Sequence, residues 1–309
     1  MFMKKVIIYG SSGGRSKYSR IMHNFYRGIK LFDGYLPIFD PTFIYKKSDI
    51  AVIFGSCREE KDAKDYHMFK KEVLKYHNGT VIFLESCLLG RIAHPAKNSH
   101  WRVGVDHFML HEGDFGWRDD CPSDRFDELG LTVKPWNDGG DYVLLGLQLL
   151  NDASLFGLDY YTWTNNILEE ILEKTDKKIK IRLHPLTDEK RWPKHMDVRR
   201  FFNEDRIMIS QGATLEEDLA NAHCMVTYTS GSGIDAVLAG VPHIAMHPGS
   251  MVYPISGHSI EDINDPPKPD RTNVLNNLAY SQWTPEEMRE GLTWKHLHNN
   301  VFNKEKEEE

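Results

Sequence analysis

The sequence predicts an α/β protein built from two Rossmann-like domains that face a cleft. Short β-branched runs alternate with helical segments in both halves of the chain, and each half contains a strand-length run that ends in a glycine-rich turn. This alternation is typical of parallel sheets with helices on both faces. At 309 residues the chain also exceeds one average domain, so two domains can each bury a core.

Three apolar runs predict the strands of the first domain. They cover residues 5–10, 49–55 and 80–85, with helical patterns after the first run and over about 59–76. A strand that stops at glycines and is followed by a helix is a βα unit, with its turn at the carboxyl edge of the sheet. Residues 94 to about 137 show no sustained period, which predicts loops at the sheet edge, where function tends to lie.

A second sheet is expected to begin near residue 141. The pattern predicts a helix over 163–174, strands over 179–185 and 206–210, a helix capped by Thr214, and an amphipathic helix from 285 to about 299. We therefore place the domains at 1–138 and 139–284. Residues 285–309 are predicted to form a helix that returns to the first domain, followed by a charged tail.

Composition excludes several classes of protein. The formal charge of −7 gives no global attraction to a polyanion, so a nucleic-acid partner would need a local basic face. No apolar run approaches the roughly 20 residues of a membrane span, and the first apolar run is too short for a signal peptide. Without a C-x-x-C pair, the cysteines predict free thiols in a cytoplasmic protein; they are Cys57, Cys87, Cys121 and Cys224.

The most informative segment is residues 226–245. It predicts a buried strand, a small-residue turn, a short helix, a Gly-Val-Pro break and a second buried strand. The turn contains Thr229, Ser230, Gly231, Ser232 and Gly233. Its hydroxyls and the amide groups at the start of the following helix predict an anion-binding site, and a phosphate group is the expected ligand. A capped tight turn is the structural alternative, and the two are compatible.

A second motif, Arg182-Leu183-His184-Pro185, ends the strand predicted over 179–185. Together with the Thr229–Gly233 turn it resembles the HP and Ser motifs of bacterial sialyl- and polysialyltransferases, capsule Kdo transferases and teichoic-acid polymerases. These enzymes are GT-B glycosyltransferases, in which two Rossmann-like domains face a cleft. Residues 215–242 and 278–284 are also similar to GT-B and capsule-type segments. The likeness covers about 140–300, and the first domain matches only in layout.

The resemblance implies a role for each matching residue. His184 would contact a donor phosphate in place of a metal ion, and Ser230, Gly231 and Ser232 would wrap the same phosphate. Arg182, Thr229 and Gly233 belong to the same motifs and are predicted to be donor-binding. Asp235 would bond the ribose hydroxyls. The alternatives are a loop histidine before a proline and an aspartate that favours the helix dipole. The resemblance implies no metal and no cofactor beyond the nucleotide sugar.

The first domain offers a glycine-rich loop after its first strand. The segment Gly10-Ser11-Ser12-Gly13-Gly14-Arg15 lacks the spacing of a dinucleotide fingerprint and is a weak signal. In a GT-B enzyme this loop would face the cleft, so the backbone at Gly13 and Gly14 is predicted to approach the sugar or acceptor, and Arg15 to contact a phosphate. A βα turn that needs small residues explains the same pattern.

The catalytic base is predicted in the polar region between residues 94 and 124. An inverting transferase needs a carboxylate or imidazole to deprotonate the attacking hydroxyl. Asp106 and Asp114 are the candidates, with His107 behind them. A helical segment would also let His107 and His111 bind zinc, but three nearby glycines argue against a helix.

The sequence therefore predicts a metal-independent glycosyltransferase that moves a sugar from a nucleotide donor to a hydroxyl acceptor. A nucleotide-sugar 2-epimerase and a non-catalytic nucleotide-sugar or DNA-binding module are the alternatives. The acceptor is either a glycan, such as a capsule polysaccharide, or a hydroxymethylated base in bacteriophage DNA. A DNA substrate would need a basic rim, for which the candidates are Lys17, Arg20, Arg27, Lys30, Arg58 and Arg91. The sugar, the nucleotide, the stereochemistry and the oligomeric state stay open.

Overall fold

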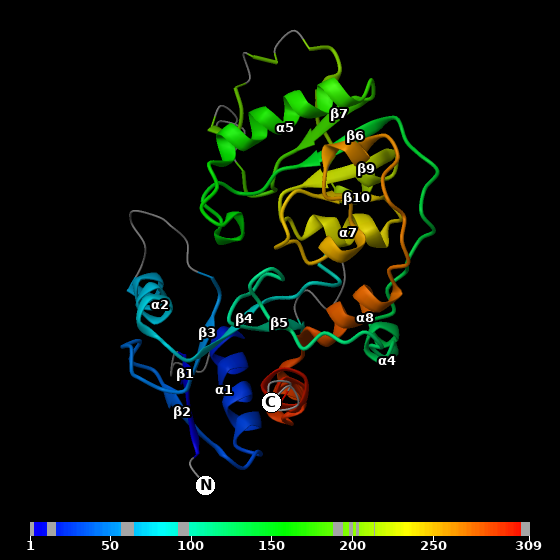
Figure 1. The fold of residues 1–309 in the computed structure, drawn as a ribbon. Helices are drawn as coiled ribbons and strands as arrows, with labels where there is room; N and C mark the ends of the chain where they lie inside the picture. The colour runs from blue at the N-terminus through cyan, green and yellow to red at the C-terminus, as the bar shows by residue number, and fades with distance from the viewer. Residues whose placement is uncertain are drawn as a thin grey trace. The chain divides into compact units, whose positions relative to one another are not determined.

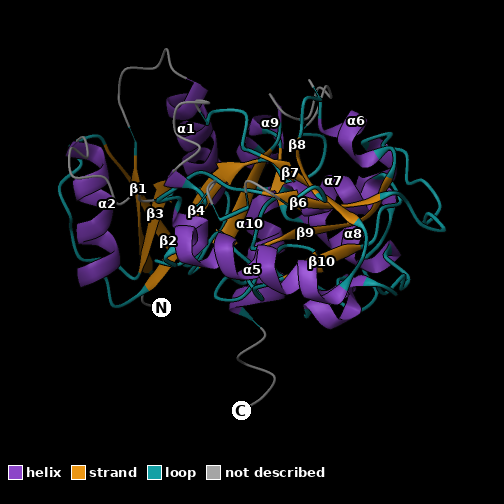
Figure 2. Ribbon diagram, turned by 90° about the horizontal axis from the view of Figure 1, so that it is seen from above, coloured by secondary structure: helices purple, strands orange, loops and turns teal. Residues whose placement is uncertain are grey.

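A computed structural model gives the fold of the chain (Figure 1). It describes residues 3–10, 17–56, 65–91, 99–187, 194–197, 200–201, 204–212 and 214–303. The chain divides into two compact units: residues 1–130 with 275–309, and residues 131–274. The sequence had placed these boundaries at 138/139 and 284/285. In each unit the strands lie between helices, as Figure 2 shows.

The first unit contains a six-stranded sheet with the order β11-β5-β4-β3-β1-β2, in which β11 is the short strand Gln282–Trp283. β1, β2, β3 and β4 are parallel, whereas β5 runs antiparallel to β4, and β11 runs antiparallel to β5. The elements before residue 130 are β1 (Lys4–Tyr9), α1 (Lys17–Ile29), β2 (Tyr35–Asp40), β3 (Ile50–Phe54), α2 (Asp65–Tyr76), β4 (Thr80–Ser86), β5 (Trp101–Val105) and α4 (Asp124–Glu128).

Three strands of this sheet, β2, β5 and the two-residue β11, were not predicted from the sequence. β2 alternates half-buried and exposed residues and contains Pro37, which is tolerated because β2 is an edge strand. β5 was predicted as loop because it is only five residues long and contains Gly104. A Cβ on Gly104 would lie 2.4 Å from the carbonyl oxygen of His107, so the glycine is needed for the turn that follows the strand. All five residues of β5 are buried.

The C-terminal segment completes the core of the first unit. Its elements are α8 (Thr272–Tyr280), β11 (Gln282–Trp283), α9 (Pro285–Arg289), α10 (Leu292–Leu297) and a π-helical turn, His298–Phe302. Trp283, Met288 and Trp294 pack in the same core cluster as Val6 and Ile8 of β1. The helix predicted over 285–299 is wrong in one respect: it breaks at Gly291, whose φ of 79° favours glycine.

The second unit contains a five-stranded sheet with the order β10-β9-β6-β7-β8, and all of its pairings are parallel. Its helices and strands are β6 (Tyr142–Gly146), α5 (Tyr160–Lys174), β7 (Lys178–Arg182), β8 (Ile207–Ile209), α6 (Leu215–Leu219), β9 (Ala222–Thr227), α7 (Ser232–Leu238) and β10 (His243–Ala245). Short 3₁₀ turns among the described residues of this unit include η1 (Ala153–Leu155), η3 (Tyr253–Ile255) and η4 (Ile260–Ile263).

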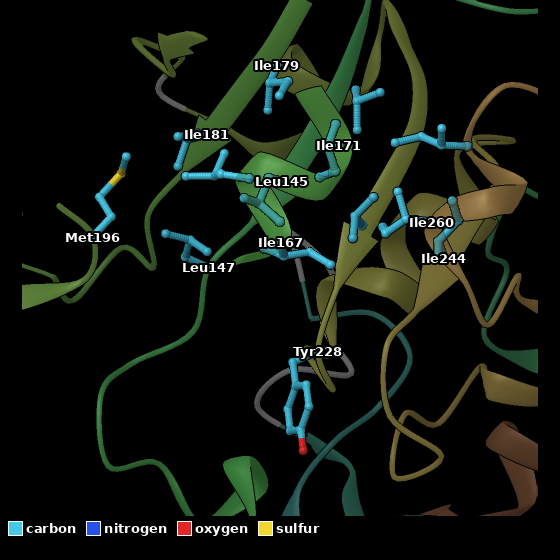
Figure 3. Packing of buried hydrophobic residues seen from close by; sticks show 14 of the residues in the cluster. Leu145, Leu147, Ile167, Ile171, Ile179, Ile181, Met196, Tyr228, Ile244 and Ile260 are labelled. Carbon is cyan, nitrogen blue, oxygen red and sulfur yellow. The ribbon is translucent and has the colours of Figure 1, made fainter. Parts of the chain in front are cut away.

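The core of the second unit lies between this sheet and α5. Leu145, Ile181 and Ile244 from the strands pack with Ile167 and Ile171 of α5, as Figure 3 shows. The strands predicted near 141, over 179–185 and over 206–210 are confirmed, as is the Thr214 cap, whose hydroxyl accepts the backbone N–H of Glu217. Because every strand here is parallel, all carboxyl ends lie at one edge of the sheet.

Candidate functional site

The HP and Ser motifs lie at the same edge of the second sheet. His184 follows the carboxyl end of β7, and Ser230 follows that of β9. β6 lies between these two strands, so the two strand ends are two spacings apart, about 10 Å. Ligands of open parallel sheets bind outside the carboxyl ends of the strands. The structure therefore brings the two predicted motifs to the same carboxyl edge of the sheet.

The ring of His184 is held by its own loop. The backbone N–H of Leu186 donates to His184 Nδ1 over 3.2 Å, and the N–H of Thr187 donates to the His184 carbonyl oxygen over 2.8 Å. A neutral imidazole whose Nδ1 accepts a hydrogen bond carries its proton on Nε2. The loop thus fixes the half-buried ring as an Nε2–H donor.

The serine turn connects β9 to α7 in a compact arrangement. The hydroxyl oxygens of Ser230 and Ser232 lie 2.8 Å apart, and the Ser232 N–H donates to Ser230 Oγ over 3.3 Å. A Cβ built on Gly146, at the end of β6, would lie 3.5 Å from Ser232 Oγ. The Ser232 hydroxyl therefore lies near the end of β6, with the Ser230 hydroxyl beside it. Since β6 is the strand between β9 and β7, the two hydroxyls lie on the side of β9 that faces β7.

Gly233 is required by close packing of α7 on β10. A Cβ at this position would lie 2.6 Å from Nε2 of His243, a side chain with no exposed surface. The Nδ1–H of His243 donates to Ser256 Oγ, and the hydroxyl of Thr227 donates to its Nε2. Burial lowers the pKa of His243 to about 3, so the ring is neutral and structural.

Thr229 takes part in a buried network rather than facing outward. Its hydroxyl donates to the Ser154 carbonyl oxygen over 2.6 Å, and its N–H donates to Gln148 Oε1 over 2.9 Å. Gln148 Nε2 also donates to Ser154 Oγ over 2.8 Å, and its N–H to the hydroxyl of Tyr160. These contacts fasten the loop after β6 to the loop after β9. Sequence analysis missed Gln148, which no pattern singles out.

Arg182 is engaged in a buried ion cluster. Its guanidinium Nη1 lies 2.5 Å from Asp218 Oδ2, and Lys180 Nζ lies 3.4 Å from Asp218 Oδ1. Asp218, on α6, is only 1% exposed. Although burial opposes it, the hydrogen bond to Tyr142 and the Asp218 charge raise the pKa of Lys180. Arg182 and Lys180 share the single carboxylate of Asp218, so the Arg182 guanidinium is held in place by α6, and its donor-binding role stays a prediction.

Asp235 and an aromatic group complete the edge. Asp235 is the fourth residue of α7 and is half-buried. The ring of His247, after β10, lies 4.8 Å from that of Tyr228 and 4.6 Å from that of Phe156, centroid to centroid. The Gly249 N–H donates to His247 Nδ1, the same arrangement as at His184. Phe156 was missed in the sequence because it lies in a turn, with φ 52°.

The predicted catalytic residues of the first unit lie at the opposite edge from the strand ends. Because β5 is antiparallel, its end at Val105 pairs with Ile82, near the start of β4. Asp106 Oδ1 accepts the Val81 N–H over 3.0 Å, and Asp114 pairs with Val105. These positions lie at the amino edge of the parallel strands. The role of Asp106 and Asp114 as bases is therefore not supported.

His107 shares the placement of the two aspartates. Its Nδ1 accepts the Met109 N–H over 3.1 Å, and its Nε2 lies 3.8 Å from Glu112. Burial lowers the pKa of His107. No cluster of three or more His, Cys, Asp or Glu able to hold a metal occurs among the residues that the structure describes.

The carboxyl edge of the first sheet holds a different carboxylate, Glu85, at the end of β4. Glu85 Oε1 accepts the Ser86 N–H over 2.7 Å, and Oε2 accepts the Ser56 N–H over 3.3 Å. The buried Lys70 of α2 donates to the carbonyl oxygens of Gly55 and Ser56 in the same loop. Glu85 is the last residue of the strand predicted over 80–85, but no pattern in the sequence predicts a catalytic role for it.

Three aromatic rings lie at this edge on the opposite face of the sheet from Glu85, because Glu85 pairs with Arg102 and not with Trp101. Tyr18 lies 4.6 Å from Phe54 and 6.1 Å from Trp101 between ring centroids, and Trp101 pairs with Ser86 across the sheet. Tyr18 is 46% exposed. The predicted loop residues Gly13, Gly14 and Arg15 follow β1 in the sequence and lie outside the described residues.

Comparison with solved structures identifies the fold. The KpsC β-Kdo 2,4-transferase of Thermosulfurimonas dismutans aligns with a TM-score of 0.51 and 13% identity, over 91% of each chain. The KpsC β-Kdo 2,7-transferase from the same organism aligns with a TM-score of 0.50 and 14% identity, over 94% of this chain and 99% of that one. The protein has the GT-B fold. No family model matches the sequence, and no curated protein matches it significantly.

The UDP-GlcNAc 2-epimerase of Methanocaldococcus jannaschii also aligns, over 96% of this chain and all of the other, with 12% identity. Its TM-score of 0.31 is too low to support an argument. None of the described helices combines the length and the apolar character that crossing a bilayer demands.

Proposed function

We propose that the protein is a GT-B glycosyltransferase that binds a nucleotide sugar at the carboxyl edge of the second sheet and transfers its sugar to a hydroxyl acceptor. The observation that supports this most is the placement of His184 and the Ser230–Ser232 turn on either side of β6. One fixed imidazole donor and two hydroxyls about two strand spacings apart suit the phosphates of a nucleoside diphosphate or monophosphate sugar.

In this proposal His184 stabilises the leaving nucleotide. As the glycosidic bond breaks, negative charge grows on the phosphate oxygen, and a preorganised Nε2–H donor is stronger toward that oxygen than toward the ground state. Such a donor replaces a metal ion. Turnover should therefore be unchanged after treatment with EDTA, and a rate that falls with EDTA and returns with Mg²⁺ or Mn²⁺ would contradict this part of the proposal.

The nucleoside is assigned to the aromatic side of the same edge. The half-buried rings of His247 and Phe156 lie next to the end of β10 against the buried ring of Tyr228, and in this proposal the base stacks on them. Stacking on such rings tolerates any base, since every base has a π-face. We therefore name the ligand by its class, a nucleotide sugar, and leave the base to experiment.

For the acceptor we propose Glu85 as the general base, in place of Asp106, Asp114 and His107. It is a carboxylate at the carboxyl edge of the first sheet, on the face opposite to the rings of Tyr18 and Trp101. In this proposal it takes the proton of the attacking hydroxyl. A glycan is the first acceptor class that we propose.

A hydroxymethylated DNA base is the second candidate acceptor, and one observation favours it. α1 has no acidic residue, and Arg20, Arg27 and Lys30 are exposed at a spacing that puts them on one face. A gel shift with hydroxymethylated duplex tests this. Binding that weakens steeply with salt and is lost in Arg20→Glu/Arg27→Glu would support DNA, whereas no binding at low salt would exclude it.

Calorimetry with UDP, GDP, CMP and TDP tests the donor site. One of the four should bind, and His184→Ala and Ser230→Ala should each weaken it by about 10-fold to 100-fold, the loss of one charge-assisted hydrogen bond. His111→Ala, an exposed histidine of the first unit, is the matched control and should leave affinity unchanged. No binding by any nucleotide, or equal affinity in all three variants, would overturn the proposal.

Turnover assays by NMR separate the remaining functions. A transferase converts the sugar nucleotide only when an acceptor is present, apart from slow hydrolysis. Isomerisation of the sugar without any acceptor would identify an epimerase, and binding without turnover would identify a non-catalytic module.

A further inference from the structure

Exposed apolar side chains are distributed unevenly over the protein. Fourteen large hydrophobic side chains are exposed among the described residues, and ten of them lie between residues 3 and 76. Single exposed apolar residues are common on any soluble protein, but a concentration in one region marks an interaction surface. The remaining four are Tyr161, Leu186, Ile209 and Leu292.

Four of the ten form what we call the apolar strip: Leu36, Ile38, Phe43 and Ile44, which are 45%, 38%, 36% and 62% exposed. Leu36 and Ile38 alternate along β2 with Phe39, whose ring stacks on His23 of α1. Their side chains therefore point to the opposite face of the sheet from α1, because successive residues of a strand point to opposite faces.

The other half of the strip lies on this same face. Ile38 pairs in register with Ile7, which lies two residues before Tyr9 and therefore on the same face, and Tyr9 packs on Phe69 of α2. The segment after β2 returns across this face, because the Tyr9 hydroxyl donates to the Lys46 carbonyl oxygen over 3.1 Å. Phe43 itself packs on Phe69, with 5.7 Å between centroids. The strip is thus continuous along β2 and the segment that follows it, at the outer edge of the sheet (Figure 1).

Lysines lie beside the apolar strip. Lys46 and Lys47 follow it directly; Lys46 forms an ion pair with Asp40, and Lys5 Nζ donates to the Lys47 carbonyl oxygen over 3.2 Å. Lys75 lies next to Tyr76, which is joined to this segment because the Tyr45 hydroxyl donates to its carbonyl oxygen. Residues 1–76 contain fifteen Lys and Arg against eight Asp and Glu, a formal charge of +7, so the remaining chain has −14. The exposed apolar residues therefore occupy the cationic part of an acidic protein.

We infer that the apolar strip and its lysines form a surface that docks on an anionic lipid bilayer. Leu, Ile and Phe side chains can enter the interfacial layer while lysines contact lipid headgroups, and binding strength depends on both. A nucleic-acid surface would use the cations but would leave these apolar side chains without a partner. The inference does not depend on the proposed activity, since it concerns neither the strand ends nor their ligands.

Co-sedimentation with vesicles tests the inference on the full-length chain. With vesicles of equal parts phosphatidylcholine and phosphatidylglycerol at 0.1 M salt, most of the protein should pellet, and 0.5 M salt should lower the bound fraction several-fold. Vesicles of phosphatidylcholine alone should retain little. Protein that binds both vesicle types equally, or neither, would overturn the inference.

Two variants and a control distinguish the two parts of the surface. Leu36→Ser/Ile44→Ser should lower the partition coefficient at least 10-fold, and Lys47→Glu should lower it several-fold and reduce the effect of salt. Leu292→Ser, at 42% exposure on α10, is the matched control and should bind as the unchanged chain does. Circular dichroism confirms that each variant is folded. A duplex DNA that binds the unchanged chain and the Leu36→Ser/Ile44→Ser variant equally, while vesicles bind neither, would assign the surface to nucleic acid instead.

Discussion

The two sheets of this protein differ in the direction of one strand, and the difference decides which residues can share a site. In the second unit all strands are parallel, so motifs 46 residues apart in sequence, at His184 and Ser230, end at one edge. In the first unit β5 runs antiparallel to β4. The polar residues that follow it, Asp106 among them, are therefore carried to the opposite edge from Glu85. Strand direction, more than residue type, determines which side chains can share a site.

The largest effect expected from this comparison concerns the base. Glu85→Gln should lower kcat by about 10²-fold to 10⁴-fold, because the amide cannot take the proton of the acceptor hydroxyl. Asp106→Asn is the matched change at the other edge and should keep kcat within a few-fold. Transfer rates with the identified donor measure both. A large loss in Asp106→Asn with none in Glu85→Gln would reverse the assignment.

A second prediction concerns the ion cluster that holds Arg182. Asp218→Asn should lower the free energy of unfolding by about 3–5 kcal/mol, because Arg182 and Lys180 lose a buried counter-charge. Urea denaturation followed by circular dichroism measures it. Asp176→Ala, an exposed acid in the same unit, should change stability by less than about 0.5 kcal/mol. If Asp218→Asn were as stable as the unchanged chain but had lost nucleotide affinity, Arg182 would belong to the donor site after all.

A third prediction uses a buried histidine in each unit. His243 has a pKa of about 3, and burial also lowers that of His296, to about 4. Both stay neutral in the folded protein, whereas in the unfolded chain they take up a proton below about pH 6.5. The unfolded chain then binds more protons, so the free energy of unfolding falls as the pH falls below about 6.5.

The pH at which the loss of stability levels off distinguishes the two histidines. Between pH 7 and pH 4.5 His243 should account for about 3 kcal/mol of lost stability, at about 1.4 kcal/mol per pH unit below its unfolded pKa. The contribution of His296 should level off near pH 4, and that of His243 only near pH 3. Denaturation of His243→Gln over the same range should show a shallower pH dependence. An identical slope would mean that His243 is protonated in the folded state.

The smallest effect is expected at Gly233. An alanine there brings a methyl group against the His243 ring, so Gly233→Ala should lower the free energy of unfolding by about 1–3 kcal/mol. Gly157→Ala, where nothing lies within 4 Å but φ is 74°, is a control for backbone strain alone. Thermal unfolding measures both. A fully stable Gly233→Ala that binds no nucleotide would show that the glycine serves the ligand and not the packing.

The sequence predicted some strands of the two sheets and not others, and the difference lies in how strong a local pattern each strand has. The buried parallel strands were recognisable as unbroken β-branched runs, and the turn after β9 was recognisable from its glycines and serines. β2 and β5 were missed because an edge strand with a proline and a five-residue strand with a glycine give weak periodic signals. Strand direction leaves no mark on composition, so the placement of Asp106 could not be predicted.

The roles of individual donor-site residues show a similar limit. His184 and Ser230 were found because they occur in short local motifs. Thr229 and Arg182 belong to the same motifs, yet their side chains bind Ser154 and Asp218, residues distant in sequence. A short sequence motif does not show which distant residues its side chains will contact in the folded protein. The network through Gln148 was missed for the same reason.

The most direct test of the central claim is a crystal structure of the chain with the nucleotide that binds tightest among UDP, GDP, CMP and TDP. The account predicts a phosphate oxygen within hydrogen-bond distance of His184 Nε2 and of a hydroxyl of Ser230 or Ser232. It also predicts the base near the rings of Tyr228 and His247. A nucleotide bound instead at the carboxyl edge of the first sheet, or elsewhere on the molecule with His184 uncontacted, would contradict it.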